Sequence, residues 1–541
     1  MALDGINHEY YRAGDAIFFE IDNTLPFEQR LQEIRALKNS GAVCKRENNK
    51  FYWFYNTGKM PSLPPLSGEP VIGSRFKGDL FSYQREDVRR ILNVNRALLT
   101  HDTGLGKTII SLYSLLSAKK DNREKNTSII VLPKSLIKQW ATHIQTRTDL
   151  SFHIISKKDI DMSKDINLVT YTRLRTLVEA LPRLRFFYAI FDEANAIKNP
   201  STKQTRAACM VNARNKLLLT ATPIKSNPSE IYSLFRAMDL SGYVFGSYTD
   251  FVEHFAVKQF SQKQNKSFIV GYKNLNELAK RIAPYIIHRE KTPEIKAEIG
   301  QKFDLLEQYR YIDMDTHQKA AQTILDAYIG HEYHETSSIY YDKTLNYSDS
   351  SRLAIFTLSR LVADDAKIAV DSKSETARML FSNMAFEFSK NEKYREMESI
   401  LDETNGKTII FTSFSTVADS VAAQLKADGH NVYLTSGETR NNDDVIAAFE
   451  HDANNDSILV STDVSKYGLD LQFCSNIIHY DLPFTYSELK QRNGRIDRIG
   501  QKSVPNVFYL ITEGSVDENM LRFIEKKKMY KDVVLNAANN N

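Results

Sequence analysis

The sequence has few cysteines, and their spacing excludes two kinds of stabilised small fold. Only three occur in 541 residues, at Cys44, Cys209 and Cys474. Thiols this far apart form neither a disulfide framework nor a zinc site, because both need closely spaced cysteines. The composition therefore predicts a protein of a reducing, intracellular compartment, either cytoplasmic or nucleoid-associated.

Long apolar runs and a strong net charge are also missing. No apolar stretch approaches the roughly 18 residues that mark a membrane-crossing helix, and the first residues lack a basic segment followed by an apolar one. We therefore expect neither a membrane protein nor a secreted protein. The net charge is only +4, so any basic track that binds a polyanion must be local.

Residues 1–60 predict a small α+β domain followed by a linker. The expected elements are a strand at 16–21, a helix at 26–38, a hairpin of 42–45 with 50–55, and a proline-rich linker at 61–75. The second hairpin strand carries Phe51, Trp53 and Tyr55 close to basic residues. Such residues can stack bases and neutralise phosphates, but they suit a small hydrophobic core equally well.

From Leu80 onward, short apolar runs alternate with helical stretches, which is typical of a parallel α/β sheet. The expected strands of a first lobe (76–302) are 97–100, 128–132, 166–170, 188–192 and 216–220. Those of a second lobe (406–535) are 408–412, 431–434, 457–461, 476–481 and 506–510. We predict a mostly helical stretch at about 228–300, a strand-free helical insertion at 303–405, a last helix at 516–535 and a disordered tail at 536–541.

Residues 101–108 (HDTGLGKT) lie between two apolar runs and are the main basis for the prediction of function. A strand, a glycine loop and a helix in this order are the context of a phosphate-binding loop. The helix start offers unpaired N–H groups to an anion, and Gly104 and Gly106 allow a close approach of the backbone. Lys107 would reach the β- and γ-phosphates and Thr108 would bind Mg²⁺. His101 takes the place of the usual first glycine, so a simple turn before a helix stays an alternative.

Two further stretches carry candidate catalytic groups. Asp192 and Glu193 follow an apolar strand, where Asp192 can hold Mg²⁺ and Glu193 can orient and deprotonate a water. The alternative for this acidic pair is a helix N-cap. Arg495 and Arg498 are three residues apart and would share a helix face. They can stabilise charge on a γ-phosphate, or they can belong to a surface of ion pairs.

Taken in order, these stretches resemble the motifs of the superfamily 2 motors, specifically the Swi/Snf-type double-stranded-DNA translocases. The similarity extends from Leu80 to near Leu535. The matching stretches are Phe81–Gln84, residues 101–108, Leu132–Trp140, Val169–Thr172, Asp192–Pro200, Leu219–Pro223, Ile287–Lys291, Ile409–Phe414, Ser461–Leu471 and Arg495–Gln501. Asn195, Ala221 and Val464–Tyr467 depart from the family pattern.

The resemblance implies two tandem RecA-like lobes that bind ATP and Mg²⁺ and act on DNA. It implies that Glu193, Lys107, Arg495 and Arg498 are catalytic, and that Asp192 and Thr108 bind the metal. The implied nucleotide contacts are Gln84, as the adenine reader, with His101, Asp102, Thr103, Gly104, Leu105, Gly106, Lys107, Thr108, Gly468 and Asp470. The implied nucleic-acid contacts are Pro133, Lys134, Thr170, Thr172, Thr412, Ser413 and Thr462.

The N-terminal domain resembles more loosely the HARP-type domain of annealing helicases, through Ile34 to Tyr55. Together these resemblances imply a monomeric ATP-driven translocase on duplex or branched DNA, with annealing, fork-remodelling or DNA-repair activity. Three alternatives stay open: a strand-separating DNA or RNA helicase, an ATPase that remodels a DNA-bound protein, and a catalytically silent nucleic-acid-binding scaffold.

Overall fold

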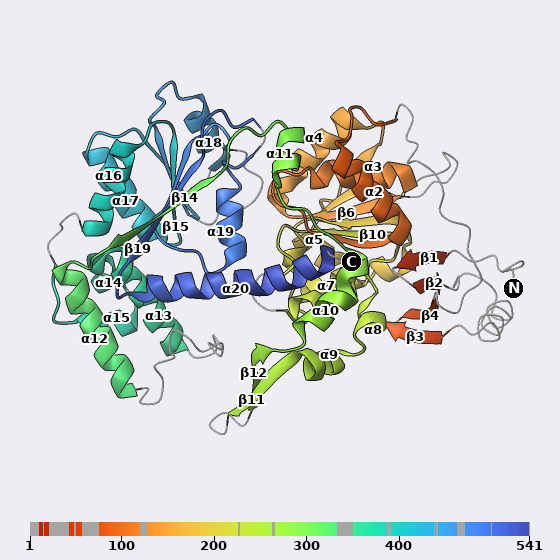
Figure 1. Cartoon of the computed structure of the whole chain (residues 1–541), viewed down its shortest axis with the longest axis horizontal. Coiled ribbons are helices and arrows are strands. Elements are labelled where there is room, and N and C mark those ends of the chain that lie inside the picture. The colour runs from red at the N-terminus through yellow and green to blue at the C-terminus, as the bar shows by residue number, and fades with distance from the viewer. Residues whose placement is uncertain are drawn as a thin grey trace, which may run out of the picture. The chain divides into compact units, whose positions relative to one another are not determined.

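The computed structural model describes residues 10–13, 16–20, 43–47, 50–56, 75–118, 127–224, 228–261, 266–332, 350–386, 391–437, 439, 442–462, 471–498 and 500–539. The chain forms two compact units (Figure 1). The first comprises residues 1–257, 272–295 and 530–541, and the second comprises 258–271 and 296–529. We call the parallel-sheet parts of these units lobe 1 and lobe 2.

The N-terminal residues form a four-stranded antiparallel sheet of order β1-β2-β4-β3. Its strands are β1 (Tyr10–Ala13), β2 (Ala16–Glu20), β3 (Val43–Glu47) and β4 (Lys50–Asn56). The predicted strand and hairpin are confirmed, whereas β1 was not expected. The predicted helix at 26–38 and the linker up to residue 74 lie outside the described residues.

Lobe 1 is built on a seven-stranded sheet of order β13-β5-β10-β9-β6-β8-β7, in which every pairing is parallel. Its strands are β5 (Arg96–Leu99), β6 (Ser128–Leu132), β7 (Phe152–Ile154), β8 (Ile166–Thr170), β9 (Phe186–Phe191), β10 (Ala213–Leu219) and β13 (Ile286–Ile287). All five predicted strands are present. The short strands β7 and β13 were missed because two or three residues leave no periodic signal.

Helices flank this sheet and close its hydrophobic core. They are α2 (Ser82–Val94), α3 (Lys107–Ala118), α4 (Ile137–Arg147), α5 (Tyr171–Leu174) and α6 (Lys203–Cys209), with short 3₁₀ turns at Lys134–Leu136, Arg175–Leu177, Leu181–Arg183 and Ala194–Ile197. The core joins helix residues such as Val88 and Trp140 to strand residues such as Ile130 and Leu217. Burial on both faces explains why the central strands read as continuous apolar runs.

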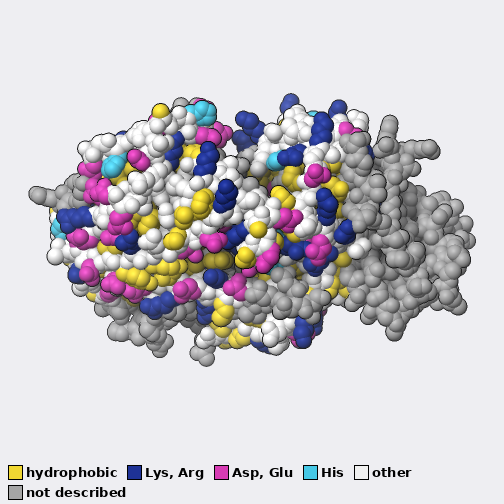
Figure 2. All heavy atoms as spheres, turned by 45° about the horizontal axis from the view of Figure 1, so that its top comes forward, with side chains coloured by type: hydrophobic (Ala, Val, Ile, Leu, Met, Phe, Trp, Pro, Cys, Tyr) yellow, Lys and Arg dark blue, Asp and Glu magenta, His cyan; other side chains and the backbone are white. Residues whose placement is uncertain are grey.

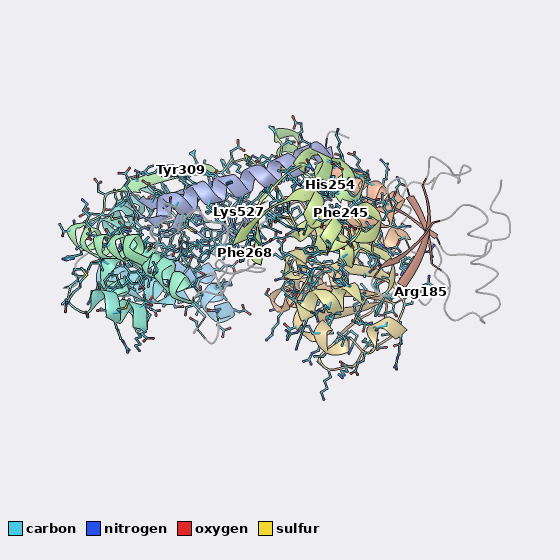
Figure 3. All side chains as sticks on the ribbon, turned by 90° about the horizontal axis from the view of Figure 1, so that it is seen from below. Arg185, Phe245, His254, Phe268, Tyr309 and Lys527 are labelled. Atoms are coloured by element: carbon cyan, nitrogen blue, oxygen red, sulfur yellow. The ribbon has the colours of Figure 1, made fainter. Side chains whose placement is uncertain are left out.

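Residues 228–300 contain helices but also, besides β13, two strands that the prediction did not include. The elements are α7 (Glu230–Ala237), α8 (Ser241–Val244), α9 (Tyr248–Phe255), β11 (Ala256–Ser261), β12 (Lys266–Tyr272), α10 (Leu275–Ile282), a 3₁₀ turn at Ala283–Tyr285, and α11 (Pro293–Glu298). Phe245 packs edge-on against Phe251 at 5.1 Å and lies 5.2 Å from Phe235; Figure 3 labels this residue. These aromatic contacts give the helices a core of their own.

Lobe 2 is built on a six-stranded parallel sheet of order β14-β19-β18-β15-β17-β16. Its strands are β14 (Leu306–Ile312), β15 (Thr408–Thr412), β16 (Val432–Thr435), β17 (Ile458–Thr462), β18 (Asn476–His479) and β19 (Asn506–Thr512). The five predicted strands are present. With lobe 1, they confirm the predicted fold class of two tandem parallel-sheet lobes.

The prediction of a strand-free insertion at 303–405 was wrong in two respects. Strand β14 lies at the edge of the lobe 2 sheet, where Leu306, Tyr309 and Tyr311 are exposed (Tyr309 is labelled in Figure 3). An exposed edge strand needs no alternating apolar pattern, so its sequence gave no strand signal. The helices that follow share one hydrophobic core with the sheet, through Leu358, Met397 and Ile410.

The remaining helices complete lobe 2. They are α12 (Thr316–Glu332), α13 (Ser350–Asp364), α14 (Ala366–Val370), α15 (Glu375–Phe381), α16 (Glu392–Glu403), α17 (Ser415–Ala427), α18 (Asn442–His451), α19 (Tyr486–Asn493) and α20 (Val516–Asn539). Helix α20 continues past the predicted end at Leu535. The predicted disordered tail is therefore wrong for residues 536–539, where two alanines favour helix.

The surface of the described residues carries both signs of charge. Lys and Arg side chains alternate with Asp and Glu on the face drawn in Figure 2, as the small net charge suggests. Among the described residues, no helix is long and apolar enough to cross a membrane.

Candidate functional site

The phosphate loop of lobe 1 joins strand β5 to helix α3. Gly104 and Gly106 have φ angles of +83° and +74°, a region that is costly for residues with a Cβ atom. Lys107 is the first residue of the 12-residue helix α3. Its Nζ donates to the carbonyl oxygens of His101 at 2.8 Å and Asp102 at 3.1 Å. The ammonium group and the helix N-terminus therefore belong to one compact loop that suits a phosphate.

Helix α2 packs against this loop through Gln84. The Gln84 amide oxygen accepts from the Phe81 N–H at 3.1 Å, and its Nε2 donates to the Leu105 carbonyl at 3.4 Å. A Cβ atom on Gly106 would lie 2.5 Å from that Nε2. Tyr83 also donates to the Leu105 carbonyl, at 3.1 Å. Gln84 thus fixes the loop in this structure, and its predicted contact with adenine stays a prediction.

His101, which replaces the usual first glycine, needs no unusual backbone. It is not among the described residues with positive φ. Its side chain is fully buried, with Nε2 3.2 Å from Asp87, and Asp87 in turn pairs with Arg289 at 2.9 Å. Burial, together with the nearby charges of Lys107 and Arg289, lowers the pKa of His101 although Asp87 acts in the opposite direction. The replacement therefore adds a buried polar contact behind the loop without disturbing the glycines that shape it.

The acidic pair lies directly after strand β9. Asp192 is buried, and its carboxylate accepts from the Trp140 indole N–H at 2.7 Å and from the Glu193 N–H at 2.8 Å. Burial raises the pKa of Asp192; the Trp140 and Glu193 donors and the Lys107 ammonium offset this effect only in part. Lys107 is therefore within electrostatic reach of Asp192. Glu193 adopts a left-handed backbone (φ +48°), a strained conformation that is common at functional sites.

The residues of lobe 1 fit Mg²⁺ held jointly with a nucleotide. Each carboxylate oxygen of Asp192 has one hydrogen bond among those described above, and a carboxylate oxygen has two lone pairs. Among the described residues, no group of three or more His, Cys, Asp or Glu side chains could hold a metal alone. Mg²⁺ commonly binds through one or two protein oxygens together with substrate phosphates, and Asp192 and Thr108 would supply those oxygens.

The predicted nucleic-acid contacts of lobe 1 follow the neighbouring strands β6 and β8. Lys134 and Thr172 are exposed, and Pro133 is partly exposed. The Thr170 hydroxyl accepts from the Arg173 N–H at 3.1 Å and so caps helix α5. The sheet order places β6 beside both β9 and β8. These segments therefore end at the same sheet edge as Asp192.

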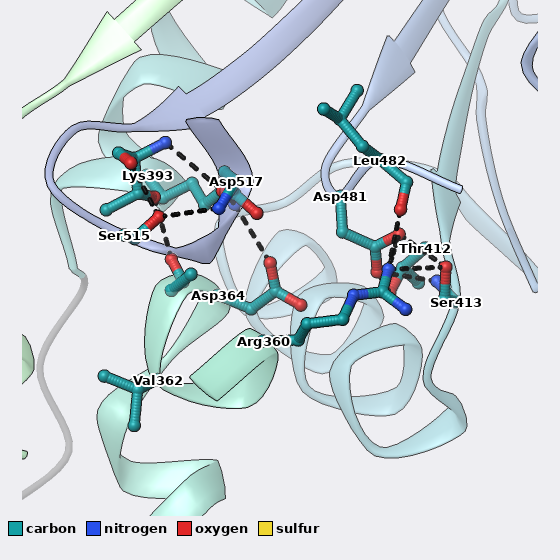
Figure 4. A network of polar contacts seen from close by, with 12 residues as sticks. Arg360, Val362, Asp364, Lys393, Thr412, Ser413, Asp481, Leu482, Ser515 and Asp517 are labelled. Atoms are coloured by element: carbon teal, nitrogen blue, oxygen red, sulfur yellow. Dashed lines mark hydrogen bonds and ion pairs between the residues drawn. The ribbon is translucent and has the colours of Figure 1, made fainter. Parts of the chain in front are cut away.

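In lobe 2, a buried carboxylate gathers several predicted residues. Asp481 accepts from the Thr412 hydroxyl at 2.8 Å and from both the N–H and the hydroxyl of Ser413 at 2.6 Å. The Arg360 guanidinium lies 3.3 Å from the same carboxylate (Figure 4). Thr412 is fully buried, so its predicted contact with nucleic acid would require a local rearrangement.

The second-lobe arginines do not lie on a helix, contrary to the prediction. Helix α19 ends at Asn493, and Arg495 and Arg498 belong to the turn that follows. The helix ends before Gly494, a poor helix former, and Ile496 in the turn is fully buried. Arg495 is buried, and Arg498 Nε donates to the Gly494 carbonyl at 2.7 Å. The turn still presents both guanidiniums within one short segment.

Of the remaining predicted residues of lobe 2, the structure describes one and does not describe the other two. Thr462 is buried at the end of β17. Gly468 and Asp470 lie outside the described residues. Their predicted contacts with nucleotide and nucleic acid therefore stay predictions.

Sequence reasoning gave no role to three residues that the geometry brings into the site. Asp87 supports the phosphate loop, Trp140 holds Asp192, and Arg360 pairs with Asp481. A tryptophan within a predicted nucleic-acid-contacting segment was the one available signal, because an indole N–H needs a partner whenever the ring is buried. The partners of Asp87 and Arg360 are far away in the sequence and could not be read from it.

Comparisons with known proteins agree with this geometry. The SNF2-related domain family matches residues 44–360, which is more than half of the chain. The helicase conserved C-terminal domain matches residues 392–500. The first match covers lobe 1 and the first part of lobe 2, and the second lies within lobe 2.

Individual relatives are more distant. The chain is 26% identical over 491 residues to YwqA of Bacillus subtilis, named as an ATP-dependent helicase/translocase, covering 87% of this chain and 50% of that protein. It is 26% identical over 532 residues to the TATA-binding protein-associated factor mot1 of Aspergillus fumigatus, covering 86% and 27%. The chain thus spans half or less of the length of these two relatives.

Among solved structures, the Sulfolobus solfataricus SWI2/SNF2 ATPase core in complex with double-stranded DNA aligns with a TM-score of 0.40 and 23% identity. That alignment covers 85% of this chain and 93% of the other. The family match over more than half of the chain and the lobe 1 geometry lead to one conclusion: the chain belongs to the SNF2-related family and contains the core of a helicase-type ATPase.

Proposed function

We propose that this protein hydrolyses ATP to move along duplex DNA. The observation that carries the proposal is the order of segments at the carboxyl edge of the lobe 1 sheet. The phosphate loop follows β5, Asp192 follows β9, and the basic segments follow β6 and β8, which lie on the far side of β9 from β5. Nucleotide-binding and nucleic-acid-binding segments would thus lie at one edge, with Asp192 between them.

Within lobe 1, each step of hydrolysis has a candidate residue. The loop N–H groups and Lys107 would bind the phosphates, and Thr108 and Asp192 would hold Mg²⁺, which neutralises charge on the β- and γ-oxygens when bound. Glu193 would orient the attacking water and take its proton. Gln84 would bind adenine after releasing the Leu105 carbonyl.

From lobe 2, Arg495 and Arg498 would stabilise the charge that develops on the γ-phosphate. Such arginines contribute on the order of 10³–10⁵ in rate. In this proposal ATP joins the two lobes and hydrolysis releases them, and repeated closure moves the DNA. Gly468 and Asp470 would complete the nucleotide contacts.

Nucleic acid would be held through its phosphates, without base readout. Pro133, Lys134, Thr170 and Thr172 would contribute from lobe 1, and Ser413 from lobe 2, with Thr412 and Thr462 as further candidates. Because phosphate contacts release counterions, binding should weaken steeply as salt is raised.

The N-terminal domain, residues 1–60, would direct the motor to branched DNA. This idea is supported by the resemblance of Ile34–Tyr55 to the HARP-type domain and by the hairpin β3–β4 in the structure. Annealing or fork remodelling would then depend on this domain, whereas DNA-stimulated hydrolysis would not.

A second candidate function is the remodelling of a protein bound to DNA. It is favoured by the similarity to mot1, whose name describes a factor associated with a TATA-binding protein. A motor of this kind would hydrolyse ATP in the same way but would need little movement along DNA.

ATP turnover measured with single-stranded DNA, duplex DNA, forked DNA and RNA tests the proposal. We expect the greatest stimulation with duplex or forked DNA, and no turnover in Lys107→Ala. Stimulation by RNA alone, or separation of tailed duplexes but not translocation on blunt ones, would favour a strand-separating helicase. Persistent turnover in Lys107→Ala would remove the assignment of the phosphate loop.

A further inference from the structure

Asp192 accepts hydrogen bonds from two segments of lobe 1 that we propose bind nucleic acid. The Trp140 indole N–H donates to its carboxylate at 2.7 Å, and the Tyr171 hydroxyl donates to its backbone carbonyl at 2.8 Å. Trp140 belongs to α4, after strand β6, and Tyr171 is the first residue of α5, after strand β8. Two direct hydrogen bonds therefore join the candidate metal-binding residue to both candidate phosphate-binding segments.

Each of these segments has a basic outer side and a buried aromatic residue. Lys134 and Lys138 are exposed beside Trp140, and Arg173 and Arg175 are exposed beside Tyr171. Trp140 is fully buried and Tyr171 is 4% exposed. Because close-packed rings cannot shift alone, a movement of either segment must move its hydrogen-bond donor relative to Asp192.

The strength of these bonds is sufficient to affect the site. A hydrogen bond to a charged group is stronger than one between neutral groups, and the coupling between two binding sites typically changes an affinity by a factor of about 5–150. The bond from Trp140 reaches the carboxylate and should therefore matter more than the bond from Tyr171, which reaches the backbone.

We propose that Trp140 and Tyr171 are positioning residues that couple nucleic-acid binding on the α4 and α5 segments to the Asp192 carboxylate. The inference rests on the proposed function, because it requires nucleic acid to bind those segments. Phosphates drawn to Lys134, Lys138, Arg173 and Arg175 set the position of α4 and α5. The indole N–H then holds the carboxylate in one orientation, with a lone pair on each oxygen directed away from the protein donors.

The first test compares three variants that each remove one buried hydrogen-bond donor. Trp140→Phe removes the indole N–H, and Tyr171→Phe removes the hydroxyl. Tyr232→Phe is the matched control, since its hydroxyl donates to the Gly246 carbonyl of the same unit and not to Asp192. We measure the affinity for a fluorescent duplex with and without Mg²⁺ and ADP, so that the readout does not depend on turnover.

We expect ADP and Mg²⁺ to change duplex affinity in the wild type by a factor of about 5–150, the usual range of coupling. In Trp140→Phe this factor should fall to within about twofold of one, in Tyr171→Phe it should fall less, and in Tyr232→Phe it should stay unchanged. An unchanged factor in Trp140→Phe, or an equal fall in Tyr232→Phe, would overturn the proposal. If Trp140→Phe does not fold, Tyr171→Phe and the fluorescence measurement below decide.

The second test uses the indole itself. The chain contains two tryptophans, Trp53 and Trp140, so Trp53→Phe leaves Trp140 as the only one. We expect its emission to change when duplex DNA is added and again when Mg²⁺ and ADP follow. A response to Mg²⁺ and ADP but not to DNA, in a protein that does bind DNA, would reject the coupling while keeping the nucleotide site. Absence of DNA binding in the wild type would instead reject the proposed function, and the coupling with it.

Discussion

Two buried aspartates, one in each lobe, follow parallel strands and have opposite charge environments. Asp192 of lobe 1 is held by neutral donors, and burial raises its pKa. Asp481 of lobe 2 is also buried, which raises its pKa, but the charges of Arg360 and Arg492 and the hydrogen bonds from Ser413 together lower it below the ordinary value. Both carboxylates lie beyond the end of a parallel strand, but the difference in pKa indicates that they have different roles. The lobe 1 carboxylate keeps the capacity to bind a cation, whereas that of lobe 2 is already neutralised by the protein.

Similar buried ion pairs recur within lobe 2. Lys393 is fully buried between Asp364 at 2.9 Å and Asp517 at 2.8 Å (Figure 4). These charges join helices α13 and α16 to the start of α20. Because breaking one partner of a buried pair leaves an uncompensated charge, we interpret these pairs in lobe 2 as structural and the Asp192 site of lobe 1 as chemical.

The largest expected effect tests whether lobe 2 takes part in the chemistry at all. Arg498→Ala should lower kcat by about 10³–10⁵ with a much smaller change in nucleotide affinity, since a charge-stabilising arginine acts mainly in the transition state. Steady-state kinetics and nucleotide titration measure the two effects. Arg310→Ala is the control, because Arg310 forms partly exposed ion pairs with Glu396 and Glu403. Equal losses of kcat and affinity would contradict the assigned role.

The next effect concerns Glu193, the residue that we propose as the general base of lobe 1. Glu193→Gln should lower ATP turnover by about 10²–10⁴, while the melting temperature stays within about 2 °C of the wild type, because the side chain is only half-buried. Turnover assays and thermal unfolding check the two halves of this prediction. Retained turnover would assign the base to another residue.

A smaller effect is expected for the structural carboxylate. Asp481→Asn should reduce the free energy of unfolding by about 3–5 kcal/mol, because Arg360 and Arg492 would lose their buried counter-charge. Urea unfolding of the full chain measures the change. Asp371→Asn, which alters an exposed pair with Lys367, should cost at most about 0.5 kcal/mol. Equal effects of the two substitutions would contradict the structural role assigned to Asp481.

The smallest expected effect is a difference between Asp192 and Asp481 in how their contribution to folding stability depends on pH. The folded-state pKa of Asp192 is raised, so its ionisation destabilises the fold as pH rises above the unfolded value near 3.8. Asp192→Asn should therefore stabilise the protein at pH 7, and the gain should shrink toward pH 4. The folded-state pKa of Asp481 is lowered, so its contribution is present above the unfolded value and is lost as pH falls through the folded one. Melting temperatures at pH 7 and pH 5 measure the first change, and a gain that grows on acidification would contradict it.

The sequence predicted the central strands of both sheets because burial on both faces demands continuous apolar runs. It also predicted the phosphate loop and the acidic pair, whose residues are adjacent in the chain. Strand β14 was missed because its outward side chains, such as Tyr309 and Tyr311, are exposed on a sheet edge. Pattern reasoning thus identified the interior of each lobe better than its boundary.

Contacts between distant residues could not be predicted. Trp140 and Asp192 are 52 positions apart, and Asp87 and Arg289 are 202 apart. The expected helix through Arg495 and Arg498 was wrong for a local reason, because α19 ends before Gly494, a poor helix former. Single motifs were enough to propose the chemistry of the site, whereas the contacts that support each motif could not be read from the sequence.

The two-residue strand β13 has a mechanical consequence. It lies at the sheet edge beside β5, and backbone hydrogen bonds from Thr100 to Ile287 (2.8 Å) and from Asp102 to Arg289 (3.0 Å) attach it to the phosphate loop. Tension on the polypeptide beyond Lys291 is therefore carried first by these few bonds. A load on the chain that leaves lobe 1 would therefore be transmitted to the loop that we propose binds phosphate.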